Sequence, residues 1–184
     1  MRLGLGFAGR GDCLTPEECR SLLGDLAAAC ARQDPPLGAS GLACRAPSRD
    51  LAFGFEAERP CAAVCFPLVG PLEGWVSWVT PWCPIDPPTP PNEGLVEQAR
   101  LVVRTFLDGV FPSPNEIGLD QPIAALDSAA SIEGALAALM KTTVPLVQLV
   151  ATISTADGLD SHLHVQCPLE TLRALRAAFL EECA

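Results

Sequence analysis

The sequence predicts an α+β fold, in which four helices pack on a mixed, mostly antiparallel sheet of about six strands. The first observation is the composition: of 184 residues, 49% are apolar and 18% are charged, which is typical of a globular protein. The second is that some segments alternate at period two, whereas others have helical periodicity. The third is their order, β-α-β-β-β-α-α-β-β-α, which lacks the regular β-α alternation of a parallel sheet.

The N-terminal third is expected to contain a strand, a helix and a long connection. Residues 2–8 alternate Leu or Phe with Gly or Ala, which predicts a strand. A helix should begin after Thr15, because Thr-Pro-Glu-Glu at 15–18 combines a capping box with proline in the first turn. It should end before residues 34–36, Asp-Pro-Pro. Residues 35–49 are rich in Gly, Pro and Ser and are expected to be a connection.

Three strands and the longest helix should follow. Residues 50–58 alternate cleanly, residues 61–66 are apolar up to Pro67, and residues 74–80 form the third arm of an antiparallel meander. Six prolines between positions 81 and 91 exclude both a helix and an interior strand. Asn92 then caps a helix with a wide apolar face, to about Val110.

The last third should consist of a loop, a helix, a hairpin and a final helix. The loop covers 111–126, and an Ala-rich helix begins at Asp127 or Ser131. Residues 144–165 predict two strands joined at Asp157-Gly158, and a helix should follow from Cys167-Pro168. We expect one domain over residues 1–184, with possible seams at 81–92 and 111–126.

Charge and cysteine content limit the partners and the compartment. The net charge of −10 argues against nucleic acid and anionic membranes, and favours a basic protein partner. No apolar stretch has the length of a signal-peptide core or a membrane span. The nine cysteines are therefore expected to be mostly buried thiols of a cytoplasmic protein.

A possible metal site lies in the second arm of the predicted hairpin. His162 and His164 should point to the same side of that strand, and Asp160 or Cys167 could complete a zinc site. No Cys-x-x-Cys or other structural zinc spacing supports such a site. The alternative is the polar face of an ordinary strand.

A possible docking surface lies where the tryptophans meet the proline-rich segment. Tryptophan is favoured at the centres of protein interfaces, and a proline-rich segment is extended and rigid. The residues assigned to this surface are Trp78, Trp82, Pro84, Asp86, Pro87 and Pro88. The alternative is a tryptophan lid over a sheet edge, with the prolines blocking edge pairing.

The function favoured by the sequence is that of a non-catalytic protein-binding module without a cofactor. It would act as an inhibitor or immunity-type protein, or as a subunit of a complex. No nucleophile is paired with a base held by a third group, although enzymatic activity stays an open question. The alternative is a metal-binding protein or metal-dependent enzyme that uses His162 and His164, and a homo-oligomer is also possible.

Overall fold

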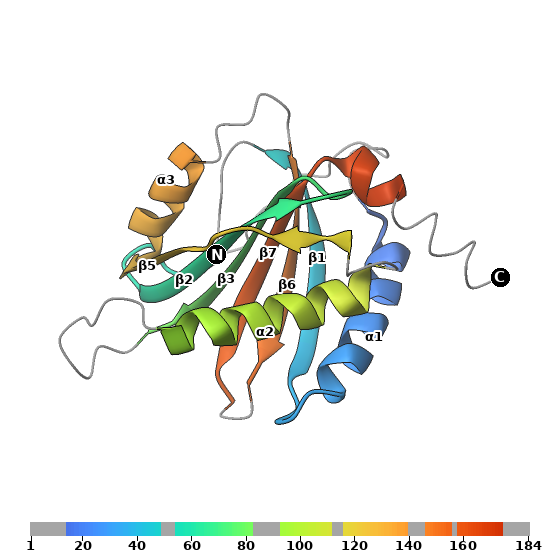
Figure 1. Ribbon diagram of the computed structural model, residues 1–184, viewed down its shortest axis with the longest axis horizontal. Helices are drawn as coiled ribbons and strands as arrows, with labels where there is room; N and C mark the ends of the chain where they lie inside the picture. Colours follow the sequence, from blue (N-terminus) through green and yellow to red (C-terminus); the bar gives the residue numbers. More distant parts are fainter. Residues whose placement is uncertain are drawn as a thin grey trace.

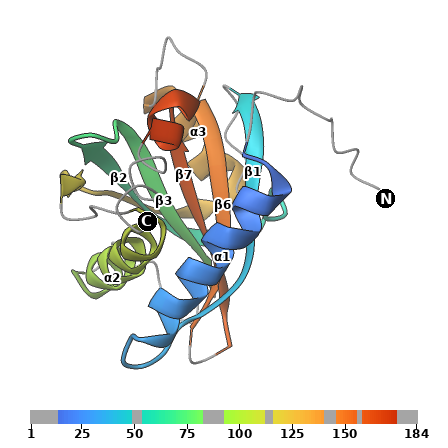
Figure 2. The ribbon, with the colours of Figure 1, turned by 90° about the vertical axis from the view of Figure 1, so that its right-hand side faces the viewer.

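The structure is a computed structural model that describes residues 14–48, 54–82, 93–111, 116–139, 146–155 and 158–174. Its described strands form one seven-stranded antiparallel sheet, and the predicted α+β class is confirmed. Helices α1 and α2 cover one face of the sheet, whereas α3 packs on the other face (Figures 1 and 2). No helix of the described residues has both the length and the apolar character needed to span a membrane.

The strands are ordered β1-β6-β7-β3-β2 across the sheet, and β4 and β5 both pair with the outer side of β2. They are β1 (Gly38–Ser48), β2 (Pro60–Val69), β3 (Gly74–Pro81), β4 (Gly118–Leu119), β5 (Ile123–Ser128), β6 (Leu146–Ser154) and β7 (Asp160–Cys167). Both hairpins, β2–β3 and β6–β7, join neighbouring strands. Strand β1 is therefore the outermost described strand on one side of the sheet.

The sheet is built from two interleaved halves with the same connectivity. Strands β1, β2 and β3 correspond in order to β5, β6 and β7. Each outer strand pairs with the other half, since β1 pairs with β6 and β5 pairs with β2. The halves meet where β3 pairs with β7. Five residue pairs join these two strands, and the middle pair is Ser77 with His164.

The larger core lies between the sheet and the first two helices. Helix α1 (Pro16–Ala31) begins with the predicted capping box, in which the Glu18 N–H donates to Thr15 Oγ1 at 3.2 Å and the Thr15 N–H donates to Glu18 Oε2 at 2.6 Å. Helix α2 (Glu93–Val110) buries one long apolar stripe against the sheet. The helices touch closely at Gly109, where an added Cβ would lie 2.9 Å from Leu26 Cα.

The other face of the sheet carries a smaller apolar cluster and a polar region. Helix α3 (Ala129–Leu139) buries Ile132 and Leu136 against Cys61 and Ala63 of β2. Helix α3 is capped by Ser128, whose Oγ accepts the Ser131 N–H at 3.3 Å. The predicted start at Asp127 or Ser131 was therefore wrong, because Ser128 between them is the cap.

Strand β1 occupies a segment that the sequence assigned to a connection. Its composition is poor for a strand, but it pairs with β6 from Gly38 to Ser48. The expected loop at 111–126 likewise contains β4 and most of β5, which both pair with β2. In both places, pairing with a neighbouring strand outweighs weak local propensity.

Two further boundaries differ from the prediction. Of the strand expected at 50–58, the structure describes residues 54–58, and these form a turn in which Gly54 adopts φ +80°. Pro67 was expected to stop β2, but it lies between the residues that pair with β5 and those that pair with β4. Between the ends of β5 and β4, neither strand requires an N–H from Pro67. The missing N–H therefore does not interrupt the pairing, and β2 continues to Val69.

The hairpin β6–β7 is confirmed, as are β2, β3 and the predicted apolar row of Val147, Leu149, Ala151 and Ile153, which is buried. The final helix begins at residue 169 and is described to residue 174. The predicted strand at 2–8, the Asn92 cap and the turn residue Asp157 lie outside the described residues.

Candidate functional site

The structure describes two of the six residues assigned to the predicted tryptophan surface, Trp78 and Trp82. Trp78 is 2% exposed, and its Nε1–H donates to Ser161 Oγ at 2.9 Å on the neighbouring strand β7. Its assignment to a docking surface was wrong, because β3 is central and its helix-facing side is buried. Trp82 is half-buried, and its backbone N–H donates to the Pro60 carbonyl at 3.0 Å. Pro84, Asp86, Pro87 and Pro88 lie outside the described residues.

The two histidines lie on the same side of β7, as predicted, with ring centroids 6.1 Å apart. His164 is 1% exposed, and its Nδ1 lies 3.0 Å from Gln148 Nε2 on β6. Arg45 Nη1 on β1 donates to Gln148 Oε1 at 3.5 Å. Because the guanidinium can only donate, the amide nitrogen of Gln148 faces His164 and donates to Nδ1. In this arrangement His164 Nδ1 is the acceptor of the hydrogen bond from Gln148.

His162 is covered by the turn that precedes β2. The Phe55 ring stacks on the imidazole with centroids 4.4 Å apart and an angle of 15° between the planes. The Arg59 guanidinium carbon lies over the Phe55 ring, 5.6 Å from its centroid. The stack holds the turn at residues 54–59 against the polar face of the sheet.

The four residues proposed as zinc ligands are not brought together. Asp160 accepts a hydrogen bond from Ser154 Oγ at 2.6 Å. Cys167 is buried in the core on the opposite face, because residues an odd number apart on a strand point to opposite sides. Within the described residues, no group of three His, Cys, Asp or Glu side chains has the geometry to hold a metal. The geometry favours the alternative, the polar face of a strand.

The buried cysteines are poorly suited to nucleophilic chemistry. Burial raises the pKa of Cys65 to about 11 and the pKa of Cys167 to about 12. Burial also raises the pKa of Cys30 and of Cys61. Since the thiolate is the reactive form, these four thiols are almost fully protonated at neutral pH.

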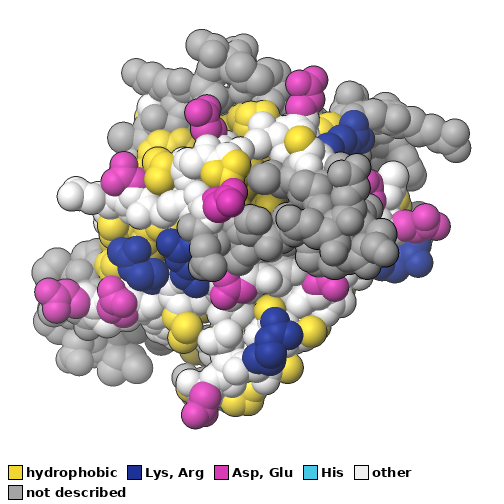
Figure 3. All heavy atoms as spheres, turned by 45° about the vertical axis from the view of Figure 1, so that its right-hand side comes forward, with side chains coloured by type: hydrophobic (Ala, Val, Ile, Leu, Met, Phe, Trp, Pro, Cys, Tyr) yellow, Lys and Arg dark blue, Asp and Glu magenta, His cyan; other side chains and the backbone are white. Residues whose placement is uncertain are grey.

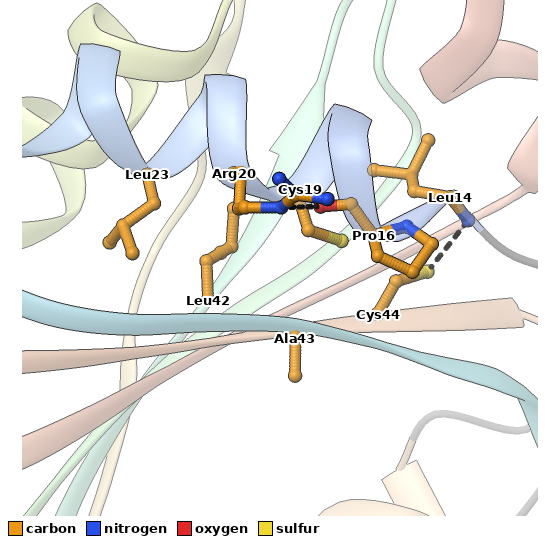
Figure 4. Close-up of a pocket in the computed structure, with 8 residues that line it drawn as sticks. All are labelled: Leu14, Pro16, Cys19, Arg20, Leu23, Leu42, Ala43 and Cys44. Carbon is orange, nitrogen blue, oxygen red and sulfur yellow. Dashed lines mark hydrogen bonds between the residues drawn. The ribbon is translucent and has the colours of Figure 1, made fainter.

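A pocket lies between the first half of α1 and the outermost strand β1 (Figure 4). We call it the α1–β1 groove, and its volume is about 320 Å³. Its lining residues are Leu14, Pro16, Cys19, Arg20, Leu23, Leu42, Ala43 and Cys44.

The groove is lined by side chains at helical spacing on α1 and at alternate positions on β1. On α1, Leu22 and Leu26 are buried in the core, whereas Cys19 and Leu23 are half-buried beside them and line the groove. On β1, Leu42 and Cys44 pair with residues of the buried face of β6 and so point to the side of α1. Figure 4 shows these β1 side chains directed at the helix and Ala43 directed away from it.

The groove is closed at one end by the residue that precedes the capping box. The backbone N–H of Leu14 lies 3.4 Å from Cys44 Sγ, and the Leu14 side chain is 6% exposed. Sequence reasoning missed this site because residues 35–49 were assigned to a connection. The available signal was the alternation of larger with small or charged residues over 42–45, Leu-Ala-Cys-Arg.

The charged side chains do not form a field of one sign on the face that carries α1 and α2. Figure 3 shows acidic and basic side chains interspersed there, with apolar patches between them. One exposed ion pair on α2, Arg100 with Glu97 at 3.7 Å, is an example. The net charge of −10 is therefore not concentrated on the described part of this face.

No family model and no curated protein matches the sequence. Solved structures do match the fold. FliY from Thermotoga maritima has a TM-score of 0.51 at 10% identity, over 91% of this chain and 98% of that one. A CheC-like superfamily protein from Shewanella sp. PV-4 has a TM-score of 0.45 at 11% identity, over 84% and 99%. The FliM middle domain from Vibrio alginolyticus has 0.46 at 12% identity, over 87% and 96%. The similarity to FliY shows a shared fold.

Proposed function

We propose that this chain is a protein-binding module without chemistry of its own, which binds a segment of another protein in the α1–β1 groove. It would act as a subunit of a complex or as an inhibitor of its partner. The observation that carries the proposal is the groove itself. It is a mainly apolar pocket of about 320 Å³ that opens beside the outermost described strand. Binding sites are typically concave and apolar, with few charged groups.

The chemistry of the described residues supports binding over catalysis. The His164 ring is buried and bonded to Gln148, and the half-buried His162 ring is stacked on Phe55, so both rings already have structural contacts. The thiols of Cys65 and Cys167 are buried and their pKa values are raised to about 11 and 12. These groups support the structure of the sheet.

The charge and the thiols support the kind of partner and the compartment that we propose. A net charge of −10 accelerates association with a basic protein through long-range attraction. The buried cysteines of the described residues are free thiols, which fits the reducing cytoplasm.

The test compares two exposed or half-exposed leucines on different helices. Leu23→Glu places a charge in the α1–β1 groove, whereas Leu101→Glu changes a side chain that is 45% exposed on α2, away from the groove. Tagged wild-type protein and both variants are used for capture from a lysate of the source organism. We expect one protein to be retained stoichiometrically by wild type and by Leu101→Glu, and at least about tenfold less by Leu23→Glu.

The melting temperatures of both variants must match that of wild type. A loss of capture by Leu23→Glu then results from the change in the groove and not from unfolding. Equal retention by wild type and by Leu23→Glu would contradict the proposal. Saturable turnover of a substrate that disappears in His162→Ala would contradict the non-catalytic part of it.

A further inference from the structure

We infer that strand β5 binds an extended, basic segment of a partner protein, which adds to the sheet as a new outer strand. The segment covers about five residues, opposite Ile123 to Asp127, and carries an apolar and a basic side chain at its two ends. This second surface does not depend on the α1–β1 groove, because β5 and β1 lie at opposite sides of the sheet (Figure 1). It is supported by the direction of the β5 backbone groups and by the side chains along that strand.

The pairing of β2 shows which backbone groups of β5 face outward. Directly after β3, the N–H of Trp82 donates to the Pro60 carbonyl at 3.0 Å, and directly after β5 the N–H of Ala129 donates to the Arg59 carbonyl at 3.0 Å. In an antiparallel ladder, successive residues direct their backbone groups to opposite sides of the strand. The even-numbered residues of β2 therefore face β3, and the odd-numbered residues face β5.

Ala124 and Leu126 are the residues of β5 whose backbone groups face away from β2. The odd-numbered residues of β2 pair with Ile123, Ala125 and Asp127, so these three use their backbone groups inside the sheet. Ala124 and Leu126 lie between them and direct their N–H and C=O groups outward. Among the described residues, β5 pairs with no strand other than β2. The outward groups are therefore a template on which an extended chain can form hydrogen bonds.

The side chains of Ile123, Ala125 and Asp127 lie in a row on the side of the sheet that carries α3. Ile123 pairs with Cys65 and Asp127 pairs with Cys61, and both cysteines belong to the apolar cluster under α3. Ile123 is 38% exposed, and Asp127 is exposed as well. An added strand would present one side chain to Ile123 and another, four residues away, to Asp127. The first of these is expected to be apolar and the second basic.

The Asp127 carboxylate is held in place near the end of β5. Its Oδ2 accepts from Ser131 Oγ at 2.7 Å, and its Oδ1 accepts from the Ser128 N–H at 2.7 Å. These two bonds, that from Ser131 first, lower the pKa of the Asp127 carboxyl group, which is therefore ionised at neutral pH. Within the described residues, no Lys or Arg forms an ion pair with it. Each oxygen keeps a further acceptor site, which a Lys or Arg of the bound strand can fill.

The charge around β5 favours a basic segment over a second copy of this chain. Residues 116–139 contain no Lys, Arg or His, and their acidic side chains are Glu116, Asp120, Asp127 and Glu133. A second copy would bring the same acidic side chains against this edge, whereas a basic segment is attracted to it. A helix would leave the outward groups of β5 without partners, because its own N–H and C=O groups are already paired. A basic extended segment fits both the backbone and the charge.

The first experiment selects peptides from a random nine-residue library displayed on phage, against the immobilised full-length chain. The expected consensus has an apolar residue and a Lys or Arg four positions apart. A fluorescent synthetic peptide with the consensus sequence is then titrated with wild type, Asp127→Lys and Leu23→Glu. We expect about tenfold weaker binding to Asp127→Lys and no change for Leu23→Glu, whose substitution lies in the α1–β1 groove. Asp127→Lys should in turn prefer a version of the peptide with Glu in place of the basic residue.

The second experiment tests the backbone on both sides of the contact. Ala124→Pro removes an N–H that faces outward, whereas the matched control Ala125→Pro removes an N–H that faces β2. We expect Ala124→Pro to melt near wild type and to bind the peptide at least about tenfold more weakly, and Ala125→Pro to melt at a clearly lower temperature. In the peptide, N-methylation at one alternating set of positions should weaken binding about tenfold, and at the other set by less than about twofold.

Several results would overturn the inference. Selected peptides without the apolar and basic pair, or binding that Asp127→Lys leaves unchanged, would exclude β5 as their site. Loss of binding in Leu23→Glu alone would place the peptide in the α1–β1 groove, which supports the proposed function and not this second surface. A dimer in sedimentation equilibrium that Ala124→Pro dissociates would identify the occupant as a second copy. If Ala124→Pro does not fold, the N-methyl peptides decide, and equal effects at all positions would exclude an added strand.

Discussion

Trp78 and His164 lie on neighbouring central strands and on opposite faces of the sheet. The indole N–H of Trp78 is bonded to Ser161, and the imidazole of His164 is bonded to Gln148. Both partners are far away in the sequence, and both side chains are buried. A residue type that suggests an interface or a metal site is here a buried side chain that forms a hydrogen bond to a neighbouring strand inside the fold.

At the residue scale we expect alkaline pH to destabilise the fold through its buried thiols. The ordinary thiol pKa near 9.0 applies to the unfolded chain, whereas burial raises the pKa to about 11 for Cys65 and about 12 for Cys167. Between these values the unfolded state loses protons that the native state keeps. Stability is therefore fully present below pH 9 and falls as the pH rises toward 11, by at most about 1.4 kcal/mol per pH unit for each thiol.

Guanidinium denaturation at a series of pH values between 7.5 and 10.5 would measure this loss, and the chain has no tyrosine to titrate in the same range. A Cys65→Ala/Cys167→Ala variant is the control, and its stability should depend less on pH. An equally steep dependence in that variant would contradict the assignment.

At the element scale, α1 and α2 pack together at a glycine whose missing side chain is required. A Cβ at Gly109 would lie 2.9 Å from Leu26 Cα and 3.0 Å from Ala29 Cβ. The first of these is backbone, which cannot move without moving the helix. The crossing of the two helices over the sheet therefore depends on a position that helix propensity alone would assign to alanine.

We expect Gly109→Ala to destabilise the protein by about 1 kcal/mol or more. The gain in helix propensity is about 1 kcal/mol, but overpacking costs about 1–3 kcal/mol and backbone contacts lie at the upper end. Gly134→Ala in α3 is the matched control, because nothing lies within 4 Å of its added Cβ. That variant should be more stable than wild type by about 0.5–1 kcal/mol.

Urea denaturation of the two variants measures both changes in the free energy of unfolding. Equal stabilisation by both substitutions would show that the helices can separate at Gly109 without cost.

At the scale of the whole molecule, the interleaved halves should make folding cooperative. Strand β1 has its described pairing only with β6, and β5 only with β2, so each half lacks its outer strand partner without the other half. The α1–β1 groove also depends on the second half, because β1 is held in place by pairing with β6. A binding site on one half thus requires both halves to be folded.

We therefore expect one unfolding transition for both halves. All three tryptophans lie between positions 75 and 82, so their fluorescence reports on β3 and on its junction with β7. Exposure of the Cys167 thiol to a thiol reagent reports on the second half. The midpoints of the two transitions in urea should coincide. A fluorescence transition that precedes or follows thiol exposure would show that the halves unfold separately.

The local sequence was sufficient to predict an element where residues close together in the chain form its characteristic pattern. The capping box at Thr15, the apolar stripe of α2 and the alternation in β6 depend on residues close together in the chain, and all three predictions were confirmed. The α+β class followed from the order of such elements. The chemistry of residues 160–167 was also partly predictable, since the two histidines do share one side of the strand.

Only the tertiary structure decided where segments of low strand propensity pair and which side chains are buried. Residues 38–48 and 123–128 have poor strand propensity, and they become strands because β6 and β2 offer them partners. The same pairing creates the α1–β1 groove, turns Trp78 inward and separates Cys167 from the histidines. These outcomes depend on hydrogen bonds and contacts between residues far apart in the chain, whereas periodicity reports only on neighbours.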